Sequence, residues 1–384
     1  MKICILTYPI HSNVGFVLQA WALQRIVLKL GHEVETIGFF VQASPKWRCI
    51  AAKIKRLLKF ILSRGKNRAF FQYIPSQEEQ KITDKNTYSF IDRNLLLTPA
   101  FYSYSNFKTL KLAQYDAFIV GSDQVWRRKY LPSIRTYFFD FVHSQEKKIR
   151  KISYAASFGV DYLEYSKKEI RDCAKLLQDF YAVSVREESG IDLCRKFFGT
   201  EAQLVLDPTL LLEKEDYLTL IRNQPKIHTG RYGVSYILDK TDRKMDFLRK
   251  VQVKMDIPFH EFLNTQKLED IGPNCIKECI YPEIEDFLRL YRDADYIVTD
   301  SFHGMVFAII FRKPFSVIVN PVRGAARFYS LLKQLGLENR MITELMPESE
   351  QMSSISAVLP IETMEKKLSA RQQSSLRFLK DALL

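Results

Sequence analysis

The sequence lacks the features that would place it in several large classes of protein. No run of eighteen apolar residues occurs in the 384 residues, so no membrane-spanning helix is predicted. No G-x-G-x-x-G fingerprint follows the first predicted strand, which argues against a dinucleotide site. The first apolar run is interrupted at Tyr8 and Pro9 with no small-residue cleavage site after it. We therefore expect a buried strand there, not a signal peptide, and a cytoplasmic protein.

Cysteine is scarce and scattered along the chain. The six cysteines lie mostly in apolar patterns, which predicts reduced, buried thiols and no disulfide framework: they are Cys4, Cys49, Cys173, Cys194, Cys275 and Cys279. The last two form a C-x3-C pair without a second pair or a nearby His, which is a weak zinc signal. We predict no metal site.

Acidic residues are absent between Thr36 and Gln77, and this stretch carries nine of the thirteen excess positive charges: Lys46, Arg48, Lys53, Lys55, Arg56, Lys59, Arg64, Lys66 and Arg68. Apolar residues recur among them at helical spacing, which predicts a basic amphipathic helix inserted at about 45–77. The charge favours an anionic surface, and we expect peripheral docking on the inner face of the cytoplasmic membrane. The alternative is that the apolar face packs on the protein's own core. Nucleic acid is not expected, because no recognition motif accompanies the charge.

Short buried strands alternate with amphipathic helices through the rest of the chain, which predicts an α/β fold with parallel sheets. Strands are predicted at 2–6, 33–39, 115–120, 152–156, 182–185, 204–206, 231–238, 258–263, 296–298 and 315–319. Helices are predicted at 16–30, 170–180, 191–198, 242–255, 284–291, 305–311, 326–335 and 361–384, and 84–105 is expected to be a connecting segment or lid. A hinge near 207–224 divides the chain into domains 1–207 and 208–384, and the terminal helix is expected to pack back on the first.

Polar turns follow five of the predicted strands. They pair Asn13 with Gly15, Ser122 with Asp123, Ser157 with Gly159, Arg186 with Glu188, and Ser301 with His303. Ligands bind at the carboxyl ends of parallel strands, so two such surfaces predict a cleft between the domains. Asp123 and His303 suit general acid and base chemistry. Three arginines suit bidentate recognition of carboxylate or phosphate: Arg186, Arg323 and Arg327.

Each of these residues also has a purely structural interpretation. His303 can pack against its neighbours at the start of a capped helix, and Asp123 can serve as a helix N-cap. Arg186 can form a salt bridge with Glu187 or Glu188. The sequence alone leaves these alternatives open.

Several motifs resemble, in order and spacing, those of the polysaccharide pyruvyl transferase family. The matching pieces are N-V-G-F-V-L-Q-A-W-A-L from Asn13, Y-D-A-F-I-V-G-S-D-Q-V-W from Tyr115, S-Y-A-A-S-F-G from Ser153, S-V-R-E-E-S-G from Ser184, L-D-P-T-L-L-L from Leu206, T-D-S-F-H-G from Thr299, R-K-P from Arg312 and R-F-Y-S-L-L-K-Q-L-G-L from Arg327. Each motif is weak alone, but the ordered set is specific.

The resemblance implies two Rossmann-like domains arranged as in GT-B glycosyltransferases, with the active site in the cleft. It implies phosphoenolpyruvate as the donor substrate, with no cofactor, and a pair of sugar hydroxyls as the acceptor. The product would be a pyruvate ketal on an exopolysaccharide or capsule, or on a lipid-linked oligosaccharide precursor. Carried over by position, His303 would be the donor-binding acid and Arg186 would bind the donor's phosphate or carboxylate. Asp123 lies where the family places acceptor-side chemistry.

One position departs from the family pattern. Many members have Arg two residues before this His, where this chain has Ser301. We predict that Lys313 or Arg323 fills the space beside Ser301, with Arg327 as a further candidate. The expected substrate-binding set is Asn13, Gly15, Ser122, Ser157, Ser301, Lys313, Arg323 and Arg327. The departure keeps two alternatives open: a GT-B glycosyltransferase that uses a nucleotide sugar, and a non-catalytic glycan-binding relative.

Overall fold

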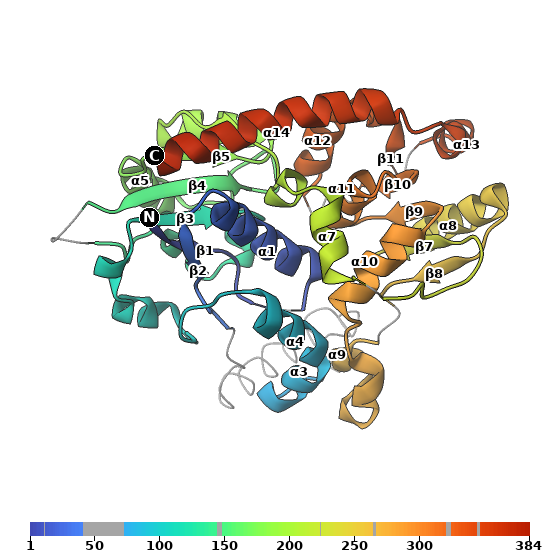
Figure 1. Ribbon diagram of the computed structural model, residues 1–384, viewed down its shortest axis with the longest axis horizontal. Coiled ribbons are helices and arrows are strands. Elements are labelled where there is room, and N and C mark those ends of the chain that lie inside the picture. Colours follow the sequence, from blue (N-terminus) through green and yellow to red (C-terminus); the bar gives the residue numbers. More distant parts are fainter. Residues whose placement is uncertain are drawn as a thin grey trace, which may run out of the picture.

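The computed structural model describes residues 1–10, 12–40, 73–143, 148–222, 224–263, 266–319, 324–343 and 346–384. Arg323, Cys49 and most of the predicted basic helix at 45–77 lie outside these residues. Two parallel sheets, one in each half of the chain, form the framework (Figure 1). No helix of the described residues is both long enough and apolar enough to cross a membrane.

The first sheet has six strands in the order β2-β1-β3-β4-β5-β6, and all neighbours are parallel. The strands are β1 (Lys2–Leu6), β2 (Glu33–Thr36), β3 (Ala117–Gly121), β4 (Arg150–Ala156), β5 (Ala182–Val185) and β6 (Gln203–Leu204). The second sheet is also parallel, in the order β11-β10-β9-β7-β8. Its strands are β7 (Gly233–Tyr236), β8 (Phe259–Glu261), β9 (Tyr296–Thr299), β10 (Phe315–Ile318) and β11 (Met341–Ile342). The predicted α/β class with parallel sheets is confirmed.

The helices of the described residues connect and cover these strands. They are α1 (Val14–Lys29), α3 (Gln77–Thr83), α4 (Lys85–Asn94), α5 (Lys167–Leu177), α6 (Glu188–Leu193), α7 (Lys214–Leu220), α8 (Asp242–Met255), α9 (Leu268–Ile271), α10 (Ile284–Asp293), α11 (Phe302–Ile310), α12 (Ala326–Leu335), α13 (Glu348–Ser356) and α14 (Ile361–Leu383). Two short 3-10 segments, η7 (Pro208–Leu211) and η8 (Pro273–Cys279), contribute to the pockets described below.

Alternate residues of the first sheet face two different apolar cores, because successive side chains of a strand point to opposite faces. In β1, Ile3 and Ile5 face a core that continues into the second half of the chain, where it includes Phe307 of α11. Cys4 and Leu6 face an aromatic-rich core on the other side of the sheet. A third core, under α8 and α13, covers the far face of the second sheet. The largest core is thus shared by the two halves.

The terminal helix α14 returns across the molecule from the second sheet to the first (Figure 1). Ser375 accepts a hydrogen bond from the Leu206 amide at 3.0 Å, and the Gln372 amide donates to the Leu210 carbonyl at 2.7 Å. Leu379 and Leu383 are buried near the end of the helix. The helix is therefore bonded to residues on both sides of the predicted boundary at 207/208. The domain boundary at 207/208 itself stays a prediction.

Two predicted segments differ from the structure. Residues 84–105 contain α4, whose buried face includes Phe90 and Ile91; the polar and aromatic composition hid this period from the sequence analysis. Helix α11 begins at Phe302, three residues before the predicted start. His303 therefore lies inside the first turn of the helix and not in a preceding loop.

Candidate active site

The carboxyl ends of the two sheets face a common pocket of about 270 Å³. Register explains this, because Gly121 at the end of β3 pairs with Tyr154 of β4, and Tyr236 of β7 pairs with Thr299 of β9. The turns after these strands therefore emerge at matching edges. The pocket is lined by Tyr8, Asn13, Asp123, Gln124, Tyr130, Leu238, Asp300, Ser301, Phe302, His303 and Arg327. Both halves of the chain contribute.

His303 is held in the first turn of α11 by the residues around it. Ser301 caps the helix, and its hydroxyl accepts a hydrogen bond from the Gly304 amide at 3.3 Å. The imidazole is buried, and its Nε2 lies 3.5 Å from a carboxylate oxygen of Asp207 without meeting hydrogen-bond geometry. A Cβ placed on Gly15 would overlap the ring. The missing side chain at Gly15 therefore makes room for His303, and not for a ligand as the sequence suggested.

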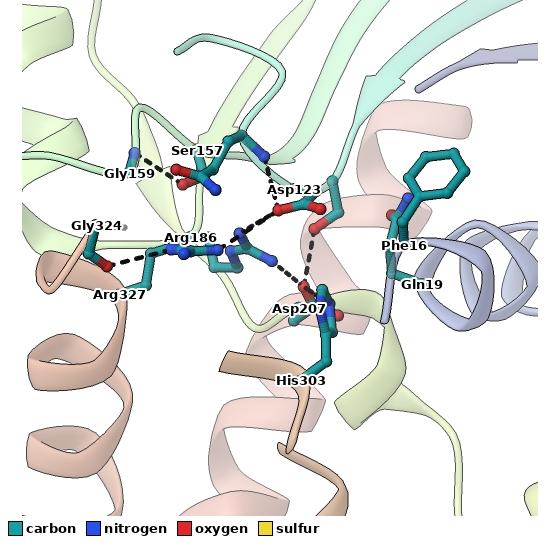
Figure 2. A network of polar contacts seen from close by, with 12 residues as sticks. Phe16, Gln19, Asp123, Ser157, Gly159, Arg186, Asp207, His303, Gly324 and Arg327 are labelled. Atoms are coloured by element: carbon teal, nitrogen blue, oxygen red, sulfur yellow. Dashed lines mark hydrogen bonds and ion pairs between the residues drawn. The ribbon is translucent and has the colours of Figure 1, made fainter. Parts of the chain in front are cut away.

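Asp207 lies at the centre of the polar network behind the pocket (Figure 2). It lies three residues after the end of β6, at the start of η7, and is buried. It accepts hydrogen bonds from Ser122, from both the amide and the hydroxyl of Thr209, and from the Arg186 guanidinium. Burial alone would raise the pKa of this carboxyl, but the charge of Arg186 and the contacts with His303 outweigh it and hold the pKa below its ordinary value.

Arg186 lies between two carboxylates and does not line the pocket. Its guanidinium pairs with Asp207 and, at 3.2 Å, with Asp123, and it stacks over the Phe302 ring at 4.4 Å. The alternative that Arg186 pairs with Glu187 or Glu188 is wrong. Glu187 instead accepts hydrogen bonds from the amides of Phe158 and Gly159. The charge of Arg186 is therefore already balanced inside the protein.

Asp123 faces both the pocket and this buried network. Its backbone has a left-handed φ of 65°, a conformation that Asp adopts more readily than most residues. Its carboxylate contacts Arg186 and, at 3.5 Å, Arg327. Burial opposes ionisation, but Arg186, His303 and Arg327 together lower its pKa. The structure shows no helix starting at Asp123, so the N-cap interpretation is wrong.

Among the described residues, Arg327 is the arginine that lines the pocket beside Ser301. Its guanidinium lies 5.2 Å from the centre of the Phe302 ring, and its Nε donates to the Gly324 carbonyl at 3.4 Å. Burial, followed by repulsion from Arg186, lowers its pKa to about 10. Among the described residues, one carboxylate, that of Asp123, forms an ion pair with Arg327, whereas two do so with Arg186. An anionic ligand would compensate that charge.

The remaining predicted residues fall into three groups. Asn13 caps α1, with its side chain accepting from the Phe16 amide at 3.0 Å, and also lines the pocket. Ser122 and Ser157 are buried behind it, bonded to Asp207 and Glu187. Lys313 lies after the far end of α11, in the electrostatic neighbourhood of Asp293, Asp295 and Lys214. The prediction that it fills the space beside Ser301 is wrong, because α11 separates it from His303.

The sequence analysis did not predict several residues that line or support the pocket. Asp207 stands in the quoted L-D-P-T motif, yet we took it only as the edge of a hinge. Tyr8 and Tyr130 line the pocket, and burial, aided by Asp123, raises the pKa of the Tyr8 phenol well above its usual range. Its hydroxyl therefore stays protonated. Asp300, which stands in the quoted T-D-S-F-H-G motif, accepts from the amide of Leu238 and from Lys244 and so stabilises the turn.

Comparison with known proteins identifies the family. A family model described as polysaccharide pyruvyl transferase matches residues 13–321, most of the chain. The chain belongs to the polysaccharide pyruvyl transferase family. Its members are transferases, and the resemblance drawn from the sequence is confirmed. No curated protein matches the sequence significantly.

Solved structures show the same fold at low sequence identity. The family member described here matches the UDP-GlcNAc 2-epimerase of Neisseria meningitidis with a TM-score of 0.50 and 11% identity, over 100% of this chain and 99% of the other. S. aureus MnaA gives 0.48 and 10%, over 96% and 90%. The wall teichoic acid polymerase TagF gives 0.45 and 10%, over 99% and 88%. The match to the epimerase shows a shared fold, and the predicted pair of parallel-sheet α/β domains is confirmed.

The candidate active site of this pyruvyl transferase family member contains titratable and cationic side chains. Within the described ranges, no three His, Cys, Asp or Glu side chains form a group that could hold a metal ion. The pocket brings a histidine, a carboxylate and a guanidinium together around one small volume. Such a set can bind an anion, donate a proton and accept one.

Proposed function

We propose that the protein transfers the enolpyruvyl group of phosphoenolpyruvate to two hydroxyls of a polysaccharide or of its lipid-linked precursor, forming a pyruvate ketal. The observation that carries the proposal is the position of Arg327 and His303 in one pocket of about 270 Å³. Phosphoenolpyruvate has two anionic groups and a methylene carbon that must gain a proton. Family membership supplies the reaction class.

Arg327 is our candidate for binding the donor's phosphate or carboxylate. It is buried, lines the pocket and has a pKa lowered to about 10 by burial and by Arg186. An anion in the pocket would reverse that unfavourable environment. The family resemblance assigned this role to Arg186, but two carboxylates already bind Arg186. We assign to Arg186 the positioning of Asp123 and Asp207.

His303 is our candidate for the acid that protonates the methylene carbon. The proton converts this carbon to a methyl group and makes the central carbon electrophilic. One sugar hydroxyl then attacks the central carbon and loses its proton to a base, and phosphate leaves. The second hydroxyl adds to the same carbon and closes the ketal, and its proton goes to the released phosphate. The proton taken by the base then restores the acid. The carboxylate of Asp207, 3.5 Å from Nε2, would balance the charge of a protonated imidazole before the transfer.

Asp123 is our candidate for the base, and donor binding would prepare it. In the structure its lowered pKa makes it a weak base, because Arg186 and Arg327 both stabilise the carboxylate. The contact with Arg327 is the longer of the two, at 3.5 Å against 3.2 Å. A donor anion that engages Arg327 would remove part of this stabilisation. The carboxylate would then become more basic when the donor is bound.

A ligand-dependent shift of thermal unfolding tests the donor assignment. Phosphoenolpyruvate should raise the melting temperature of the full-length protein, because it binds only the folded state. Uridine diphosphate sugars at the same concentration should raise it less. The reverse ranking would favour the alternative, a GT-B-type glycosyltransferase. Protection by phosphoenolpyruvate without phosphate release in the presence of any glycan acceptor would favour the non-catalytic alternative.

The activity assay then tests the residues. His303→Gln should retain the fold and lose turnover, because glutamine cannot deliver a proton to carbon. Near-normal phosphate release by this variant would contradict its assignment as the acid. Ser354→Ala, on α13 away from the pocket, is a suitable control for general effects of substitution on a buried hydroxyl.

A further inference from the structure

A second pocket, of about 310 Å³, lies on the other side of the connection between β1 and α1. Tyr8 and Asn13 of this connection line the candidate active site, whereas Ile10 and Ser12 line the second pocket. Described residues of one connection therefore border both pockets. A ligand that is longer than the donor can reach from one to the other.

Both halves of the chain build this pocket. Helices α3 and α4 form one wall, while α9 and η8 form the other, and the four segments lie together at one side of the molecule (Figure 1). Hydrogen bonds join the walls: the Tyr281 amide donates to the Thr83 carbonyl at 2.9 Å, and the Asn86 side chain donates to the Tyr281 carbonyl at 2.8 Å. The pocket is thus formed before any ligand binds.

The lining suits a neutral molecule rich in hydroxyl groups. It carries two carboxylates, two amide side chains, two tyrosines and two hydroxyl side chains: Asp84 and Glu269, Gln80 and Gln266, Tyr88 and Tyr281, Ser12 and Thr83. Carboxylates accept strong hydrogen bonds from hydroxyls, amides both donate and accept, and aromatic rings supply apolar contact area. Among the described residues that line the pocket, Lys267 is the one cation. Two carboxylates against one lysine disfavour an anionic ligand such as phosphoenolpyruvate.

Asp84 is kept in this pocket at a cost to folding. Burial, with a contribution from Glu269, raises its pKa to about 6, although Thr83 and Ser12 hydrogen-bond to it. Its side chain makes no capping hydrogen bond to α4, so capping does not explain its presence. Hydroxyl donors of a ligand would stabilise the ionised carboxylate and offset the cost of its burial.

We propose that this second pocket binds a neutral sugar residue of the acceptor glycan while the hydroxyls that react lie in the first pocket. The inference rests on the proposed function, because it takes the reacting partner to be a glycan. It adds where the glycan lies and which residues select it. A neutral oligosaccharide would pass over the β1–α1 connection and contact both halves of the chain.

Glycan binding tests the inference without the transfer reaction. The full-length protein is applied to an array of neutral and acidic oligosaccharides, and the neutral oligosaccharide with the highest signal is titrated in solution. The double variant Asp84→Asn with Glu269→Gln, and the single variant Tyr88→Ala, should each bind it at least tenfold more weakly. Asp246→Asn removes a carboxylate that lines a different pocket, on α8, and should leave binding unchanged.

The outcomes separate this inference from the proposed function. Unchanged thermal protection by phosphoenolpyruvate in the same variants, with at least a tenfold higher KM for the oligosaccharide, supports both. If no neutral oligosaccharide binds, or if the variants bind it as tightly as the parent, the second pocket is not the acceptor site even where phosphoenolpyruvate still protects. If the variants lose glycan binding but phosphoenolpyruvate never protects, the glycan site stands and the donor assignment fails.

Discussion

The imidazole of His303 occupies the space that a side chain at Gly15 would take. Gly15 belongs to the first turn of α1 in the first half of the chain, and His303 to the first turn of α11 in the second. The two helices begin against each other. The position of the candidate acid therefore depends on a glycine that is almost three hundred residues away in sequence.

Gly15→Ala should displace the His303 ring, because the added methyl would overlap three of its side-chain atoms. We expect turnover to fall by at least tenfold, with thermal protection by phosphoenolpyruvate largely retained through Arg327. Gly199→Ala is the control: its left-handed backbone strains an alanine by ~1 kcal/mol, but no atom lies near the new methyl. Equal turnover in the two variants would contradict the positioning of His303 by Gly15.

Arg327→Met should abolish protection by phosphoenolpyruvate while leaving the unliganded protein no less stable. The pKa of Arg327 is lowered, so its charged form opposes folding at every pH below about 10. Removing the charge relieves this cost, which offsets the lost stacking on Phe302. Arg195→Met, at an exposed arginine paired with Glu201, should keep the protection. Thermal scans with and without phosphoenolpyruvate measure both effects.

Arg186→Met should behave in the opposite way and destabilise the protein strongly. The substitution leaves the buried carboxylates of Asp123 and Asp207 without their main counter-charge. Breaking a buried pair in this way costs roughly 3–5 kcal/mol. Urea denaturation at neutral pH measures the loss. A midpoint similar to that of Arg327→Met would show that the two arginines are equivalent, against the structure.

Asp207→Asn should flatten the loss of stability in acid. The pKa of Asp207 is lower in the folded protein than its ordinary value. Its contribution to stability is therefore complete above about pH 4 and is lost as the pH falls further, towards the folded pKa. The variant lacks this contribution at neutral pH and has less to lose on acidification. Denaturation curves between pH 7 and pH 2, with Asp246→Asn as the control, check the sign.

Asp84→Asn should stabilise the protein near neutral pH and leave stability in acid unchanged. The pKa of Asp84 is raised to about 6 by burial and by Glu269, in a pocket that also holds Tyr88, Tyr281 and Lys267. The carboxyl favours folding below about pH 4, and this advantage is lost as the pH rises through about 6. At pH 7 to 8 we expect the variant to gain roughly 1–3 kcal/mol. A lower melting temperature at pH 8 would show that burial of Asp84 is not costly.

Binding to anionic vesicles tests the proposed peripheral membrane association. Each lysine or arginine near an anionic surface contributes about 1 kcal/mol, screened within a Debye length. The protein should therefore sediment with anionic vesicles at low salt and less at high salt. Changing Lys55, Arg56 and Lys59 together to Glu should remove this binding. If the triple variant sediments as before, the basic stretch does not serve the membrane.

The sequence predicted the regular elements well where one period dominates. The predicted helices at 242–255 and 326–335 agree with α8 and α12, and Gly336 ends α12 in a left-handed conformation. Strand β11 was missed because its two residues are too short to show alternation. Periodicity indicates which face of an element is buried. It therefore predicts the elements themselves better than it predicts the residues that pack against them.

The candidate site could be predicted only in part for the same reason. His303, Asp123 and Ser301 follow buried strands, and their place at a sheet edge follows from that pattern. The charge balance around Arg186 does not follow from that pattern, because the partners of Arg186 are 63 residues before it and 21 residues after it in sequence. Lys313 and Arg327 look alike as nearby cations in the sequence. Only the length of α11 and the position of α12 show that Arg327 lines the pocket and that Lys313 does not.

The path of α14 across the molecule has a consequence for truncated forms of this protein. A stop codon at Gln372 would leave every pocket residue in the product, from Tyr8 to Arg327. It would nevertheless remove Ser375, which bonds to the Leu206 amide beside Asp207, and the buried Leu379 and Leu383. The truncated product would retain every motif on which the family resemblance rests. It would lose the hydrogen bond that supports the chain beside Asp207, the residue that contacts several side chains of the site. A gene survey that counts motifs alone would score such an allele as intact.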